Sequence, residues 1–94
     1  MPDIDVTRTH ALGLAGARQT ASEVAAHLGA EYGVRPRWDG DVLRVKGRGF
    51  SGALEATESA VRVTATLGLL MRPFRSAIQA EIERHLDRHV GTPA

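Results

Sequence analysis

The chain has 94 residues, of which 43% are hydrophobic, and it contains one Trp, one Tyr, two Phe and no Cys. At this length we expect a single domain over residues 1–94, ordered from about 3 to 90 with a short C-terminal tail at 91–94. Its core must be built mainly from Ala, Val, Leu and Ile, which leaves little volume for a deep ligand cavity. The lack of Cys excludes disulfides and thiolate metal sites. Nothing at the N-terminus resembles a signal peptide and no apolar run approaches membrane-spanning length, so we expect a cytoplasmic protein.

The balance of charge restricts the kinds of partner that the surface can attract. Twelve Lys and Arg stand against eleven Asp and Glu, which gives a formal net charge of +1. A surface built throughout for polyanions would be strongly basic, so this class of protein is excluded. Any binding driven by charge must be confined to a local patch.

The first third of the chain predicts a strand followed by a long helix. Residues 3–8 alternate between apolar and polar side chains, which is typical of a half-buried strand. The strand should end near Arg8, whose charged head must reach solvent. Over residues 14–32 the apolar positions recur mostly every three or four residues, which predicts an amphipathic helix of about five turns. Gly33 suits the left-handed position that ends such a helix.

The middle of the chain predicts a hairpin of two strands. Asp39-Gly40 should supply the positive backbone angles of a type I′ turn between them. Pro36 has no backbone N–H to donate, so its strand should lie at an edge or pair on one side only at that point. The next strand should continue from the hairpin through a bulge at residues 47–49 to about residue 56.

The last third predicts one more strand and a long helix. Residues 61–69 alternate, with Leu67 and Leu69 at the end of the inner face. Pro73 suits the first position of a helix that runs to about Val90. The buried stripe of this helix should contain Phe74, Ile78, Ile82, Leu86 and Val90 at a spacing of four, widened by Ala77.

These elements predict an α+β fold in the order β-α-β-β-β-α. A four-stranded, mostly antiparallel sheet should carry a helix that crosses over from the first strand, with the long C-terminal helix packed on the sheet. The pattern leaves open where the first strand lies in the sheet. It also leaves open the oligomeric state, because an exposed edge strand could pair with a second copy of the chain.

One candidate binding surface lies where the last strand passes to the last helix. Arg72 and Arg75 stand at a helix N-terminus, where cations are disfavoured by a few tenths of a kcal/mol to about 1 kcal/mol. An anion would remove this penalty, either an internal carboxylate such as Glu55 or Glu58, or an external carboxylate, phosphate or lipid head group. Apolar contact beside the charges should come from Leu70 and Met71. The surface patch predicted here consists of Leu70, Met71, Arg72 and Arg75.

A second candidate is a basic hairpin. Its cations alternate with residues that should face the core, and they are Arg35, Arg37, Arg44, Lys46 and Arg48. They could bind a nucleic acid or an anionic lipid, but the outer face has none of the aromatic side chains on which single-stranded nucleic acids stack. We favour a solvated sheet face whose long side chains guard an edge.

The sequence supports a metal site or catalytic residues less well than the two binding surfaces. Glu81, His85 and His89 are spaced by four and would lie on one helix face, as zinc or nickel ligands do. The same histidines suit a helix C-terminus, so we predict no metal site and no cofactor. His10 has no recognisable nucleophile or orienting carboxylate, and the glycines of "GRGFSG" do not open a helix as in a phosphate-binding loop. We therefore expect no catalytic residues and no enzymatic activity.

Three blocks of sequence carry a family resemblance. The blocks "HALGLAGAR", "YGVRPRWDGDVLRVKGRGFSGALEA" and "LGLLMRPFRSAIQAEIERHLD" resemble a family of small bacterial polyhydroxyalkanoic acid system proteins, over residues from about Asp3 to Val90. The resemblance implies an association with the synthesis loci and storage granules of polyhydroxyalkanoate, an intracellular polyester, and a part in granule formation or its regulation. It implies no catalytic residues. The positions that carry it include Trp38, Gly40, Arg72, Pro73, Phe74 and Arg75.

Three functional hypotheses follow. The first is a non-enzymatic cytoplasmic accessory protein that binds a polyhydroxyalkanoate granule surface, a granule protein or an acyl ligand. The second is a small module that holds an acyl chain in a groove between the sheet and the last helix. The third is nucleic-acid binding through the basic hairpin. A filled core with an exposed patch at residues 70–75 would favour the first over the second.

Overall fold

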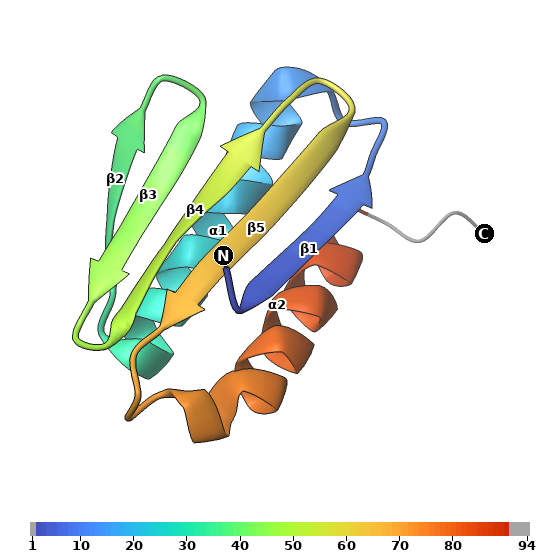
Figure 1. The fold of residues 1–94 in the computed structure, drawn as a ribbon. Coiled ribbons are helices and arrows are strands. Elements are labelled where there is room, and N and C mark those ends of the chain that lie inside the picture. Colours follow the sequence, from blue (N-terminus) through green and yellow to red (C-terminus); the bar gives the residue numbers. More distant parts are fainter. Residues whose placement is uncertain (1, 91–94) are drawn as a thin grey trace.

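The computed structural model describes residues 2–90, apart from the side chains of His89 and Val90. The expected tail at 91–94 and the end of the helical stripe at Val90 therefore lie outside the described residues. The elements, in chain order, are β1 (Ile4–Thr9), α1 (Gly13–Tyr32), β2 (Arg35–Asp39), β3 (Val42–Gly47), β4 (Phe50–Ala56), β5 (Ala60–Leu67), the 3₁₀ turn η1 (Arg72–Phe74) and α2 (Arg75–Val90) (Figure 1).

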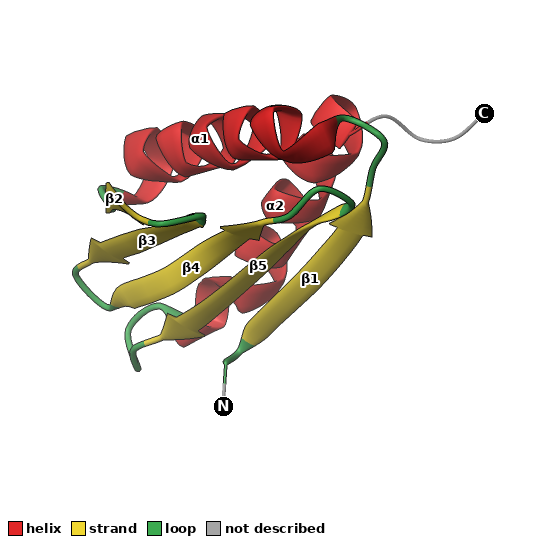
Figure 2. Ribbon diagram, turned by 90° about the horizontal axis from the view of Figure 1, so that it is seen from above, coloured by secondary structure: helices red, strands yellow, loops and turns green. Residues whose placement is uncertain are grey.

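The sheet has five strands in the order β1-β5-β4-β3-β2, and every neighbouring pair is antiparallel. Because β1 and β2 occupy opposite edges, α1 carries the chain across the whole width of the sheet between them. Both helices cover the same face, and the other face has no described element over it (Figure 2). This α+β architecture agrees with the predicted class and places the first strand, which the sequence left open, at an edge beside β5.

The predicted bulge at residues 47–49 is wrong, because the chain reverses there and forms a further hairpin. Gly47 pairs with Phe50, so Arg48 and Gly49 alone make the turn between β3 and β4. Gly49 has a φ of +73°, which glycine adopts without strain. Its carbonyl also accepts a hydrogen bond of 2.8 Å from the N–H of Gly68. The sheet therefore has five strands rather than four, and Arg48 lies in a turn rather than on a strand.

The predicted hairpin around Gly40 is confirmed, but its turn type is wrong. Asp39 belongs to β2 and pairs with Val42, so the two turn residues are Gly40 and Asp41. Gly40 has a φ of +63°, and no described residue other than glycine has a positive φ. Positive φ at the first turn residue only is the pattern of a type II′ turn. Pro36 lies on the edge strand β2, as predicted.

The core lies between the sheet and the two helices. On α1, the helix ends as predicted at Gly33, which has a φ of 71° and donates its N–H to the carbonyl of Gly29. On α2, the predicted stripe is confirmed by three side chains that are at most 1% exposed, which are Ile78, Ile82 and Leu86. No helix in the described part of the chain is long and apolar enough to cross a membrane.

The start of the predicted stripe is wrong. Phe74 is 53% exposed, and Ala77 is also exposed. For Phe74 the physical reason is that α2 begins at Arg75, and the preceding 3₁₀ turn has a different winding from the α-helix. Ala77 lies inside α2, where the buried stripe is narrower than predicted. Pro73 lies inside this turn rather than at the first position of α2.

Candidate functional site

The link between β5 and α2 presents apolar side chains to solvent. Strand β5 ends at Leu67, two residues earlier than predicted, and Leu69 and Leu70 are 81% and 83% exposed. Placing Leu69 on the inner face was therefore wrong. The chain leaves the sheet here because Gly68 packs against the backbone of Gly49 and the next residues form a tight turn. We call the set Leu69, Leu70, Met71, Arg72 and Phe74 the corner patch.

Backbone hydrogen bonds hold the corner patch in place. The N–H groups of Met71 and Arg72 donate to the carbonyl of Gly68, at 2.9 and 3.2 Å. Met71 is half-buried and packs on the core, whereas its neighbours Leu70 and Arg72 are exposed. The exposed leucines therefore stand on a closed turn that keeps them away from the core.

The two arginines of this segment have different surroundings. Arg75 donates from Nε to the backbone carbonyl of Asp3 at 2.8 Å and so links the start of α2 to the residue before β1. Arg72 makes no hydrogen bond or ion pair through its side chain within the described residues. The suggested internal carboxylates are not their partners, since Glu55 lies 3.9 Å from Arg62 and no described ion pair involves Glu58.

A shallow groove adjoins the corner patch. It is lined by Glu31 and Tyr32 at the end of α1 and by Met71 and Phe74. The Tyr32 ring stacks on the ring of Phe50 at a centroid distance of 6.0 Å. The groove lies at the surface, whereas the space beneath α2 is filled by the core side chains of that helix. The structure therefore offers apolar contact beside the patch rather than a tunnel under the helix.

The facing sides of α1 and α2 bring titratable side chains together. The Tyr32 hydroxyl donates to Glu81 Oε2 at 2.9 Å, and His27 Nε2 lies 3.7 Å from the same oxygen. The His27 and His85 rings are in contact, with a centroid distance of 3.8 Å. Burial raises the pKa of Tyr32 to about 12, with further contributions from the hydrogen bond to Glu81 and the charges of Glu81 and Glu31.

The sequence indicated only half of this cluster. Glu81 and His85 do share a face of α2, but the third predicted member, His89, has a side chain outside the described residues. Their neighbours on α1, His27 and Glu31, were missed. Those two residues are also four apart, which was the available signal, but only the packing of the two helices shows that both pairs face each other.

The basic hairpin lies on the uncovered face of the sheet. Arg35 pairs across the strands with Lys46, and Arg37 pairs with Arg44. Cations directly opposite each other are unfavourable, and the only described ion pair among these four is from Arg44 to Asp39 at 3.5 Å. Since β2 is an edge strand, this arrangement is also what discourages edge-to-edge pairing.

Arg18 of α1 fastens the turn of this hairpin, which the sequence did not reveal. Its guanidinium lies 4.0 Å from the centre of the Trp38 ring and donates to Asp41 and to the carbonyl of Gly40, both at 2.8 Å. Asp41 therefore pairs with α1 instead of opposing the hairpin cations.

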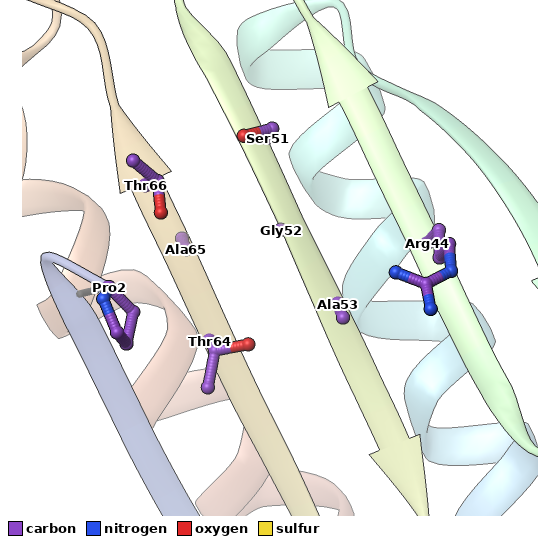
Figure 3. A pocket seen from close by; sticks show the side chains of 8 residues that line it. All are labelled: Pro2, Arg44, Ser51, Gly52, Ala53, Thr64, Ala65 and Thr66. Carbon is purple, nitrogen blue, oxygen red and sulfur yellow. The ribbon is translucent and has the colours of Figure 1, made fainter.

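The rest of the uncovered face is nearly flat and carries small side chains. A shallow depression is lined by Pro2, Arg44, Ser51, Gly52, Ala53, Thr64, Ala65 and Thr66 (Figure 3). Toward β1 the face carries an ion pair, in which Asp5 accepts two hydrogen bonds from Arg62 at 2.8 and 3.0 Å. These bonds lower the pKa of Asp5. Ser51, Thr64 and Thr66 have no base or carboxylate of the kind that activates a nucleophile among the residues lining the depression.

Comparison with known proteins identifies the family. The model of the family described as "Putative polyhydroxyalkanoic acid system protein" matches residues 4–90. The chain belongs to this family. No curated protein and no solved structure matches the chain.

The family assignment bears on how the candidate residues are interpreted. The family description associates the chain with the polyhydroxyalkanoic acid system. His10, the one histidine at the end of β1, has a structural role here, since its ring accepts the Leu12 N–H at 3.0 Å and contacts the Thr57 carbonyl. Three of the large apolar side chains that are exposed among the described residues belong to the corner patch, namely Leu69, Leu70 and Phe74.

Proposed function

We propose that this protein is a non-enzymatic, cytoplasmic accessory protein that binds the surface of polyhydroxyalkanoate granules through the corner patch. The observation that carries the proposal is the pair of adjacent leucines, 81% and 83% exposed, beside the half-exposed ring of Phe74. Large apolar side chains gathered on one part of a small protein are typical of an interaction surface. Membership of the polyhydroxyalkanoic acid system family supports a hydrophobic polyester as the binding partner of this surface.

The chemistry of the patch suits a polyester. Fully burying a leucine side chain contributes about 1.5–3 kcal/mol, so the two leucines alone could supply most of a weak surface affinity. The ester carbonyls of the polymer are hydrogen-bond acceptors, and the guanidinium of Arg72, which has no side-chain partner among the described residues, is a donor beside the leucines. Because the tight turn already orders the patch, little conformational entropy is lost when it binds.

Sedimentation with polyester particles tests this proposal. We expect the wild-type protein to bind protein-free polyhydroxyalkanoate particles, and the double variant Leu69→Ser, Leu70→Ser to bind at least about tenfold more weakly. The matched control is Leu12→Ser, which changes a leucine that is 46% exposed. Leu12 belongs to the link between β1 and α1, and this link lies at the opposite end of the sheet from the link between β5 and α2 (Figure 1). This control should bind like the wild type.

Two outcomes would contradict the proposal. If the double variant folds and still binds the particles like the wild type, the corner patch is not the binding surface. If the wild type binds native granules but not protein-free particles, the partner is a granule protein rather than the polymer. Circular dichroism and the midpoint of thermal unfolding provide the check that each variant is folded.

A further inference from the structure

We propose that α1 and α2 together form a binding site for a divalent transition-metal ion, with His27, Glu31 and Glu81 as its ligands. The proposal is independent of the granule-binding function. Zinc is the reference ion, since it accepts one imidazole nitrogen and two carboxylate oxygens as ligands and completes its coordination with water.

The distances between the three side chains fit a single ion. One possible ligand atom of each residue lies within 4.8 Å of those of the other two. His27 Nε2 and Glu81 Oε2 are 3.7 Å apart. In a tetrahedral zinc site with bonds of about 2.0–2.1 Å, neighbouring ligand atoms are about 3.3 Å apart. Small side-chain rotations would therefore bring these atoms to bonding distance without moving the backbone.

Two packed helices hold the ligands. His27 and Glu31 are four residues apart on α1 and share a face, and Glu81 projects from α2 toward them. The two helices pack against each other and on the same face of the sheet (Figure 2). The His85 ring, one turn beyond Glu81, contacts the His27 ring at a centroid distance of 3.8 Å. Sites built on helices in this way are more rigid than sites on loops.

The hydrogen bonding around the site leaves a place for a cation. His27 Nε2 is buried and has no hydrogen-bond partner among the described residues, an arrangement that destabilises the fold when nothing occupies it. A metal bond to this nitrogen would remove the penalty. The Tyr32 hydroxyl, which donates to Glu81, would act as the outer-shell group that fixes the orientation of a ligand.

The site is also open enough for an ion to enter. The side chain of His27 is 29% exposed and that of Glu81 is 24% exposed, and Glu31 is more exposed than either. Water can therefore reach the remaining coordination positions. With two carboxylates facing one imidazole, a divalent cation would balance more of the local charge than a single proton on His27 would.

Zinc titration of the untagged protein tests the proposal. We expect a one-to-one zinc complex, measured by competition with a chromogenic chelator, and an upward shift of the thermal midpoint that EDTA reverses. Glu31→Gln and Glu81→Gln should each weaken zinc binding by about tenfold or more, as should Tyr32→Phe by about tenfold. The matched control is Glu58→Gln, an exposed carboxylate in the β4–β5 turn, and its affinity should stay within about twofold of the wild type.

Other results would overturn the assignment. If zinc shifts neither the chelator competition nor the thermal midpoint of the wild type, there is no metal site between the helices. If Glu31→Gln and Glu81→Gln retain wild-type zinc affinity while His10→Gln loses it, the ion binds elsewhere on the chain. Glu81 is more buried than Glu31, so the Glu81→Gln variant could fail to fold. Because Glu31 is exposed, Glu31→Gln should fold and would still show whether zinc affinity depends on the proposed ligands.

Discussion

At the scale of single residues, Arg72 and Arg75 show how two similar side chains in one short segment take different roles. Both precede or begin α2, where positive charge is unfavourable. Arg75 is bound to the backbone carbonyl of Asp3, whose own carboxylate accepts the N–H of Leu67 at 2.7 Å. It therefore stabilises the junction of β1, β5 and α2, whereas Arg72 remains available to a partner.

Separate substitutions of these arginines should affect different properties, the stability of the fold for Arg75 and particle binding for Arg72. Arg75→Gln should lower the free energy of unfolding by about 0.5–1.5 kcal/mol, because it removes one hydrogen bond from a charged donor. Arg72→Gln should change the stability by less than about 0.5 kcal/mol but weaken binding to polyester particles, because it removes a charged hydrogen-bond donor beside the leucines. Urea unfolding and particle sedimentation measure the two effects. Equal loss of stability in both variants would show that Arg72 also has an internal partner.

At the scale of elements, α2 is held by a narrow stripe of buried side chains and begins later than its sequence pattern suggests. Ile78, Ile82 and Leu86 are buried, one turn apart, but Phe74 at the same spacing is exposed. The 3₁₀ turn changes the winding just before Arg75, so the period of four does not extend across the boundary. Helical spacing therefore identifies the buried face only within the helix itself.

A pair of alanine substitutions tests this boundary. Ile82→Ala should lower the free energy of unfolding by about 2–5 kcal/mol, because it leaves a cavity in a filled core. Phe74→Ala should cost less than about 1 kcal/mol, although it removes more atoms, since the ring is 53% exposed. Chemical denaturation measures both. A large loss in the Phe74 variant would mean that the 3₁₀ turn packs into the core in solution.

At the scale of the whole molecule, the two ends of the described chain are joined through Arg8. Its guanidinium, near the end of β1, donates to Asp87 at 2.8 Å and to Glu83 at 3.0 Å, both on α2. These two carboxylates raise the pKa of Arg8. Arg8 lies on the same face of β1 as the buried Ile4 and Val6, and its pairing with α2 explains how a charged side chain is accommodated there. The same pairing connects the last helix to the first strand.

Removing this link should have a measurable and salt-dependent effect. Arg8→Gln should lower the free energy of unfolding by about 0.5–2 kcal/mol, given two partly exposed ion pairs, and the difference from wild type should shrink at high salt. The control Arg88→Gln removes an exposed cation of α2 that has no partner within the described residues. It should leave the stability unchanged. An identical loss in both variants would assign the effect to net charge rather than to the link.

Local patterns in the sequence determined the elements themselves. The periods of two and four identified both helices and the strand-forming stretches, although β3 and β4 were predicted as one strand with a bulge, and Gly33 and Pro36 marked a helix end and an edge strand correctly. These features depend on residues that are close in the sequence and on the backbone preferences of single residues, so they can be predicted from the sequence alone. The same blocks of residues were enough to suggest the family that the comparison confirms.

Only the tertiary structure decided which distant residues meet. Apolar and polar side chains alternate on both sides of Gly49, a pattern that fits one strand with a bulge as well as two strands joined by a turn. Only the pairing of β3 with β4 in the folded chain shows that there are two strands. The exposure of Leu69 and the bond from Arg75 to Asp3 likewise depend on the close approach of the β5 end to other elements. The His27 cluster required two helices to face each other. The periodicity of apolar residues specifies which face of a helix or strand is buried. The packing of all elements together determines which residues that face and the ends of the element contact.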